Sequence, residues 1–465
     1  MERLNPLDAF FLFVEDGTTH MHIASCAVFE GPAPEYERVA ASIGSKLDRV
    51  PRYRQRVRFV PLQLGRPVWV DDPHFKLEYH LRHTALPPPG GDRELHALMG
   101  RLMSQELDRH RPLWEAWLVE GLRPDRWALV TKIHHSMADG VAGNDLLAAI
   151  LDVERDAEPV AAAPWRPEPE PSGVALAGDA LLDAVRTATT TALAAGRALG
   201  APAHAWSEVR ALAGGALSFA RRVPPPPASS LVGTIGPHRR WTSVVAPLDD
   251  VKAVRRALGG TVNDVIVAVV TGGLRTLLLG RGESAAGHVV RTLVPVSVRN
   301  EDEHGAFDNR VSAMVADLPL AVADPVERLR AVRAQMEQLK ASHQTLAGQG
   351  VTALGELAPS AALAFAERAS MQVLRRLPQH TLNAVVTNVP GPQFPLFLGG
   401  REMLEYLPFV PIVYGMRIGV AIVSYNGRLA FGLTGDYDSV PDLDVLAEGI
   451  EKSLAELVTL ARPAR

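Results

Sequence analysis

The chain has 465 residues, which is more than one hydrophobic core usually serves and favours two or three structural units. A formal net charge of −4 excludes a strong overall attraction to nucleic acid. Cys26 is the only cysteine, so an intrachain disulfide is excluded.

The first residues carry acids and a proline where a signal peptide would carry basic and then apolar residues. The longest apolar run, residues 407–423, is interrupted by Pro408, Pro411 and Arg417. A membrane-spanning helix needs about 20 apolar residues and disfavours a central arginine. We therefore expect a cytoplasmic protein without a signal peptide or a transmembrane helix.

The first 155 residues mix strand and helix patterns. Residues 94–107 place leucines and methionines at helical spacing and predict an amphipathic helix against a core. Residues 117–120 and 127–133 predict two paired strands around a turn. Further strands are expected at 23–29, 56–61 and 67–70, and a further helix at 37–47.

The middle of the chain differs in composition. Residues 158–172 are acidic and rich in proline, which predicts an extended linker. Residues 173–222 are rich in alanine and leucine and predict a helical insert, which the prolines at 224–227 end. One face of this insert is expected to carry Val174, Leu181, Leu182 and Val185.

The remaining residues predict a second α/β unit. Strands are expected at 241–247, 289–298, 311–318, 384–387, 418–425 and 428–434, and helices at 251–258, 263–279, 325–342 and 443–460. Asn426-Gly427 is a typical hairpin turn. The fold class is α/β (α+β), with two lobes that are each a mixed sheet with flanking helices. We divide the chain into an N-terminal lobe (1–155), a linker and helical insert (156–238) and a C-terminal lobe (239–465).

Residues 131–140, TKIHHSMADG, carry the clearest chemical pattern. Side chains alternate across a strand, so adjacent histidines at a strand end direct one ring inward and the other toward a cleft. A neutral imidazole can accept the proton of an alcohol that attacks a thioester. Asp139 can fix the following turn, and Gly140 allows close backbone approach. A metal site and two structural histidines are the alternatives, although the spacing matches no common zinc motif.

HHSMADG resembles the HHxxxDG motif of CoA-dependent acyltransferases, and other segments resemble the bacterial wax ester synthase/diacylglycerol acyltransferase family. These segments are NPLDAFF at 5–11, RPLWE at 111–115, GPHRR at 236–240, TVND at 261–264, PVSVR at 295–299, NRVS at 309–312 and TNVPGP at 387–392. Each segment is weak alone, but together they cover nearly the whole chain. The resemblance implies two CoA-dependent-acyltransferase-like lobes.

The resemblance also implies roles for individual residues. His135 would be the general base, His134 its support, and Asp139 a structural residue. From the place of Arg299 after a strand we expect it to pair with Asp139, and an ordinary exposed arginine is the alternative. Residues implied near the substrates, or as candidate oxyanion donors, are Pro112, Leu113, Trp114, Asn263, Asp264, Ser297, Thr387 and Asn388. A buried tryptophan and a helix N-cap are the structural alternatives for Trp114 and for the Asn263-Asp264 pair. The basic residues 238–240 could bind CoA phosphates or anionic lipid.

The function implied by the resemblance is transfer of a long-chain acyl group from acyl-CoA to diacylglycerol or a long-chain alcohol. Acyl-CoA would be a co-substrate, without a metal or another cofactor. Lipid substrates favour peripheral contact with the inner membrane or lipid inclusions, for which 173–222 and 404–414 are candidate segments. A condensation-type acyltransferase that uses carrier-bound chains, or a non-catalytic lipid-binding or lipid-coat protein, would share the motif or the fold.

Overall fold

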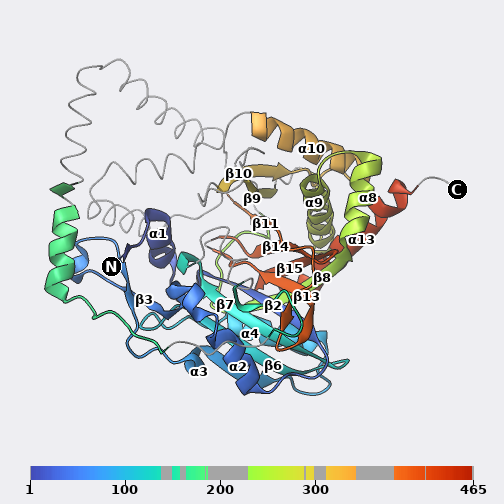
Figure 1. The fold of residues 1–465 in the computed structure, drawn as a ribbon. Coiled ribbons are helices and arrows are strands. Elements are labelled where there is room, and N and C mark those ends of the chain that lie inside the picture. The colour runs from blue at the N-terminus through green and yellow to red at the C-terminus, as the bar shows by residue number, and fades with distance from the viewer. Residues whose placement is uncertain are drawn as a thin grey trace, which may run out of the picture.

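The computed structural model describes residues 2–137, 149–157, 164–183, 185–186, 229–286, 290–297, 311–341, 382–413 and 415–462. Two six-stranded sheets and their helices form two adjoining lobes (Figure 1). Each sheet contains both parallel and antiparallel neighbours, which confirms the expected fold class.

The N-terminal sheet has the strand order β12-β13-β2-β7-β6-β5. Its strands are β2 (His22–Glu30), β5 (Leu81–Ala85), β6 (Trp114–Leu122), β7 (Arg126–His134), β12 (Phe397–Leu398) and β13 (Arg401–Phe409). The accompanying helices are α1 (Pro6–Val14), α2 (Tyr36–Gly44), α3 (Leu77–His80) and α4 (Asp92–Met103). Antiparallel pairing of β2 with β7 sets His22 opposite His134. The predicted hairpin of β6 and β7 is confirmed.

Strands β12 and β13 come from the C-terminal part of the chain, yet they belong to the N-terminal sheet. β13 pairs antiparallel with β2, and Leu407 and Phe409 are buried. The apolar segment 404–414 was a candidate for membrane contact. Its residues 404–409 instead form part of β13 and pair within the N-terminal sheet. The division at residue 239 stays a prediction. Strands β12 and β13 follow that residue in the sequence but belong to the N-terminal sheet.

The C-terminal sheet has the order β10-β9-β11-β14-β15-β8. Its strands are β8 (Arg239–Pro247), β9 (Val290–Ser297), β10 (Val311–Leu318), β11 (Ala384–Pro390), β14 (Ile418–Tyr425) and β15 (Arg428–Asp436). Its helices are α8 (Leu248–Leu258), α9 (Val262–Gly280), α10 (Pro325–Ala341) and α13 (Leu443–Ala461). Asn426 and Gly427 both have positive φ, 41° and 77°, so the predicted hairpin turn joins β14 to β15.

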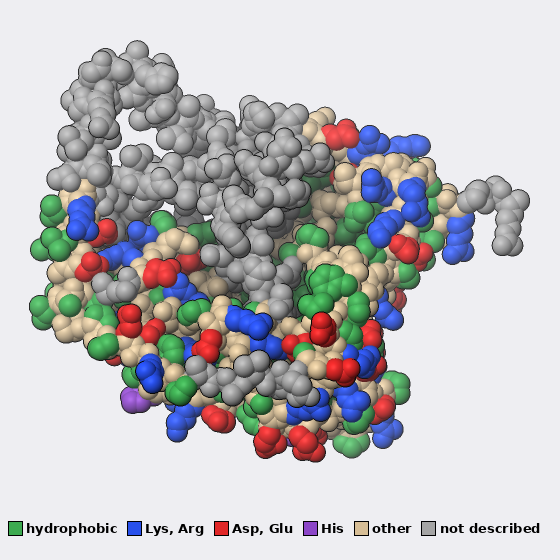
Figure 2. Space-filling view, viewed as in Figure 1, with side chains coloured by type: hydrophobic (Ala, Val, Ile, Leu, Met, Phe, Trp, Pro, Cys, Tyr) green, Lys and Arg blue, Asp and Glu red, His purple; other side chains and the backbone are tan. Residues whose placement is uncertain are grey.

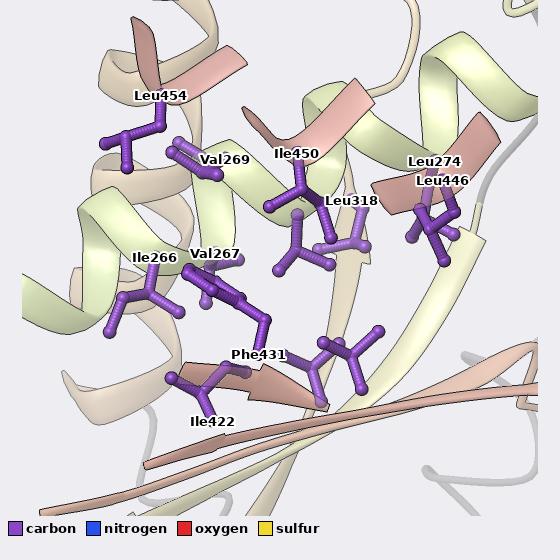
Figure 3. Close-up of a cluster of buried hydrophobic side chains, with 14 of the residues drawn as sticks. Ile266, Val267, Val269, Leu274, Leu318, Ile422, Phe431, Leu446, Ile450 and Leu454 are labelled. Carbon is purple, nitrogen blue, oxygen red and sulfur yellow. The ribbon is translucent and has the colours of Figure 1, made fainter. Parts of the chain in front are cut away.

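The two faces of this sheet serve different packing surfaces. Ile422 and Phe431 point into the cluster formed with α9 and α13 (Figure 3). Gly273 and Gly449 let these two helices approach closely, because an added Cβ on Gly273 would lie 2.6 Å from Ile450. Trp241, on the other face, packs in a cluster with α4 and β13, which joins the two lobes.

A small sheet with the order β1-β4-β3 lies beside the N-terminal lobe. Its strands are β1 (Glu2–Arg3), β3 (Gln55–Arg58) and β4 (Val68–Asp71), and three short 3₁₀ turns (Leu47–Arg49, Pro51–Arg54 and Pro61–Gln63) adjoin them. The helical residues 173–183 rest on this unit through Leu176 and Ala180. The face predicted for Val174, Leu181, Leu182 and Val185 is exposed.

Exposed basic side chains gather at one corner of the molecule, over α8 and α10 (Figure 2). α8 carries the exposed Arg255 and Arg256, and α10 carries the exposed Arg330 and Arg333. In the described part of the chain, α9 is the one helix long and apolar enough to cross a membrane, and 72% of its most apolar window is buried. α9 is therefore a core helix of its lobe.

Candidate active site

The two motif histidines lie at the carboxyl end of β7, in the middle of the N-terminal sheet. The backbone N–H of His134 donates to the carbonyl of Leu113 at 2.9 Å, and that of His135 donates to Met21 at 2.8 Å. His134 is fully buried, whereas His135 begins a 3₁₀ turn (His135–Met137) and is only half-buried. The two adjacent histidines therefore differ in exposure.

The surroundings of His134 define which ring nitrogen carries its proton. The backbone N–H of Ser136 donates to Nδ1 at 3.1 Å, and the Ser136 hydroxyl lies 2.7 Å from the same atom. Nδ1 is therefore an acceptor, and the proton of the neutral ring is on Nε2. Nε2 faces the carboxylate of Glu15, whose Oε2 is 3.6 Å away.

Glu15 is a buried carboxylate at the end of α1. Arg109 donates to its Oε2 at 2.7 Å, and the backbone N–H of Met21 donates to its Oε1 at 3.1 Å. Burial alone raises the pKa of Glu15, but the interaction with His134 and the hydrogen bond and charge of Arg109 outweigh it and lower the pKa to about 2. The site therefore holds a negative charge behind His134 at neutral pH.

His135 lies against the ring of Phe11, with the ring centroids 4.0 Å apart and the planes at 32°. Burial lowers the pKa of His135 to about 4, and its own backbone carbonyl only partly opposes this effect. The imidazole is therefore neutral at pH 7 and able to accept a proton.

Further polar groups are buried behind the histidines. Lys132 donates to the carbonyls of Leu102 and Gln105 at the end of α4, and burial lowers its pKa to about 8. The His22 ring lies 3.0 Å from the carbonyl of Met103, and burial lowers its pKa well below the usual value. Their hydrogen bonds tie the strand ends to α4 and explain their burial.

The segment Pro112-Leu113-Trp114 lies beside the histidines but is built into the core. Leu113 supplies the carbonyl that fixes His134. The Trp114 side chain is 4% exposed, and its indole N–H donates to the carbonyl of Tyr53 at 2.8 Å. These contacts favour the structural interpretation of Trp114, while its role near a substrate channel stays a prediction.

Two predicted residues of the C-terminal lobe meet at the start of α9. The Asn388 side chain, on β11, donates to Asn263 Oδ1 at 3.2 Å. Asp264 instead caps α9, because its carboxylate accepts from the backbone N–H of Thr261 at 2.7 Å. Among the described residues, we find no hydrogen bond from the Asn263–Asn388 pair to either motif histidine.

The other predicted residues are placed less fully. Thr387 is half-buried on β11, and Ser297 is the last residue of β9. Asp139, Gly140 and Arg299 lie outside the described residues, as does the proposed pairing of Asp139 with Arg299.

Arg239 is not the phosphate-binding residue that its basic neighbours suggest. Its side chain is buried and donates to the carbonyls of Thr18, Gly236 and His238. Burial lowers the pKa of Arg239 to about 10. Arg239 therefore fastens the loop after α1 to the C-terminal lobe.

Sequence reasoning missed Glu15, Arg109, Ser136 and Phe11 as members of the site. Glu15 and Arg109 are 94 residues apart, so no local spacing connects them. Phe11 belongs to the opening segment that resembles the family, but its position against His135 follows from the fold. An acid directly after an apolar run, as Glu15 is after residues 10–14, is the one local signal that could have indicated a buried carboxylate.

Family models match both parts of the chain. The wax ester synthase/diacylglycerol acyltransferase catalytic domain matches residues 4–266, and the C-terminal domain of that family matches residues 307–458. The chain belongs to this family. It is an acyltransferase, and the resemblance drawn from the sequence is confirmed.

Individual relatives agree with the family assignment. The chain is 39% identical over 464 residues to "Probable diacyglycerol O-acyltransferase tgs1" of Mycobacterium tuberculosis, covering 99% of this chain and 97% of that protein. It is similar in structure to the wax ester synthase/diacylglycerol acyltransferase of Marinobacter aquaeolei VT8, with a TM-score of 0.70, 28% identity and 99% of each chain covered. A condensation domain of the CDA synthetase shares the fold, with a TM-score of 0.58, 17% identity, and 100% of this chain and 97% of that one covered.

Proposed function

We propose that this acyltransferase moves a long-chain acyl group from acyl-CoA to diacylglycerol or a long-chain alcohol, with His135 as the general base. The observation that carries the proposal is the neutral, half-buried His135 ring beside a buried His134 that is held in one orientation. The names of the relatives support the two kinds of acceptor.

The chemistry requires only a base and an environment that accepts developing negative charge. His135 takes the hydroxyl proton as the alcohol oxygen attacks the thioester carbonyl. The tetrahedral oxyanion then collapses, the carbon–sulfur bond breaks, and the leaving CoA sulfur takes the proton from the His135 imidazolium. The products are triacylglycerol or wax ester and free CoA.

The oxyanion needs nearby hydrogen-bond donors. We propose Asn388 and Asn263 as the first candidates, because their mutual hydrogen bond orients two amides on the C-terminal lobe. Ser297 and Thr387 are further candidates. We also propose that Asp139 pairs with Arg299 to hold the turn after His135, and that Gly140 allows close substrate approach.

The lipid acceptor favours work at a membrane or lipid-inclusion surface, without a spanning helix. The exposed Val174, Leu181 and Leu182 on residues 173–183 support this proposal, because exposed apolar side chains favour contact with lipid. We propose a cytoplasmic protein associated with that surface peripherally.

A second candidate function is transfer of an acyl chain from a carrier protein instead of from CoA, because the chain shares its fold with condensation domains. A non-catalytic lipid-binding or lipid-coat role is the remaining alternative. A carrier-dependent enzyme would show transfer from an acylated carrier but not from acyl-CoA. A lipid-binding protein would show binding without turnover.

The test is CoA release from palmitoyl-CoA with hexadecanol, with dipalmitoylglycerol or with neither, using wild type and His135→Ala. Release should depend on an acceptor and fall about 10²- to 10⁴-fold in the variant, the range for loss of a general base. His83→Ala is the matched control, since His83 is an exposed histidine paired with Glu120 at 2.9 Å. Acceptor-dependent release that survives in His135→Ala would overturn the proposed mechanism.

A further inference from the structure

Helix α1 contacts both motif histidines. Phe11 lies against the His135 ring, and Glu15, which follows the helix, faces His134. Asn5 starts the helix by accepting from the backbone N–H of Asp8 at 2.8 Å, and Pro6 occupies its first position. The opening segment of the chain thus forms a defined helix, and the end of this helix lies beside the two histidines.

The hydrogen bonds of His134 show what the Glu15 carboxylate can do for this ring. Its Nδ1 accepts the backbone N–H of Ser136, so a neutral ring must carry its proton on Nε2. Among the described residues, the buried Nε2 has no hydrogen-bond partner. The Glu15 carboxylate is the group that this N–H faces, at 3.6 Å.

Glu15 is itself held in place, which a positioning group requires. Arg109 binds its Oε2 through two nitrogens, at 2.7 and 3.2 Å, and also reaches the carbonyl of Leu12 in α1. The backbone N–H of Met21 donates to Glu15 Oε1, and the carbonyl of the same residue accepts from the backbone N–H of His135. One carboxylate therefore links α1, the start of β2 and the histidine pair.

We propose that Glu15 is a positioning residue for catalysis: it fixes the tautomer and orientation of His134, and through that ring and the adjoining backbone it sets the direction of His135. The proposal rests on the proposed function, because it assumes that His135 is the base. Polar groups behind a functional imidazole commonly act in this way, and their removal costs about 10- to 100-fold in activity where this has been measured at metal sites.

Glu15→Gln tests the proposal with little change in volume. The amide keeps one oxygen but removes the charge, so it holds the His134 N–H less firmly. We expect kcat to fall about 10- to 100-fold, with the KM for palmitoyl-CoA changed less than about twofold because Glu15 is buried behind His134.

Glu115→Gln is the matched control. Glu115 is a glutamate of the same lobe, also 7% exposed, and it also pairs with an arginine, Arg82, at 2.9 Å. Its carboxylate contacts Arg82 and Trp117 and, among the described residues, neither motif histidine. We expect this variant to lose as much thermal stability as Glu15→Gln while its kcat stays within about threefold of wild type.

A double-mutant cycle with His134→Asn separates positioning from general support of the fold. If Glu15 acts through His134, Glu15→Gln lowers kcat in the wild-type background but has almost no further effect in His134→Asn. Equal losses in both backgrounds, or a Glu15→Gln enzyme with wild-type kcat, would overturn the proposal. A failure of His135→Ala to lose activity would instead overturn the proposed function, so the two failures are distinguishable.

Discussion

The end of β7 and the helix α9 are both buried, but the buried side chains are mostly polar at the end of β7 and mostly apolar on α9. β7 and the turn after it bury Lys132, His134 and Ser136 within five residues. α9 buries thirteen residues, of which only Asp264 and Thr271 are polar. Burying polar groups costs free energy unless each finds a partner, so such a concentration needs a chemical or structural reason.

The comparison separates the contacts that stabilise a lobe of this acyltransferase from those that hold the proposed base in place. The apolar contacts of α9 with α13 and the C-terminal sheet stabilise the lobe without touching the histidines. The polar contacts at the end of β7 fix atoms in space and contribute less through buried apolar area. Substitutions in the two regions should therefore affect different measurements.

The largest effect on stability is expected from Ile450→Ala. Ile450 is fully buried on α13 against Gly273, and removing three carbons from such a site costs about 2–5 kcal/mol. Urea unfolding should show this loss, while the kcat of the folded variant at 15 °C stays within about twofold of wild type. A tenfold fall in kcat for the folded variant would break the separation between the two regions.

A smaller effect is expected from Asp264→Ala. Asp264 and Thr261 cap the start of α9 reciprocally, so loss of the carboxylate should lower the free energy of unfolding by about 1 kcal/mol. Thr261→Ala should cost a similar amount, and the double variant less than the sum. Additive losses from the two changes would show that the two side chains act independently and would contradict the reciprocal cap.

Local patterns were sufficient for the long periodic elements. The leucines and methionines of α4 are buried as their spacing predicts, and the hairpin of β14 and β15 follows from Asn426-Gly427. β13 was not predicted, because the strand that it pairs with is more than 370 residues earlier in the sequence. A strand's partner in the sheet is a property of the whole fold and not of its own residues.

The site was predictable in part for the same reason. His134 and His135 are adjacent in sequence, so the pattern brings them together without knowledge of the fold. Asn263 and Asn388 were each proposed separately, but their hydrogen bond depends on how α9 packs beside β11. Glu15 reaches His134 only because α1 lies against the end of β7, which no residue spacing expresses.

The central claim is that a neutral His135 acts as the base, and the pH dependence of kcat/KM tests it most directly. Because burial lowers the pKa of His135 to about 4, the base form persists well below pH 6.5. We expect kcat/KM for palmitoyl-CoA and hexadecanol to stay level from pH 8 to about pH 5 and to fall only near pH 4, with circular dichroism showing that the fold persists over the level range. An acid limb centred near pH 6.5, the ordinary value for histidine, would contradict the account.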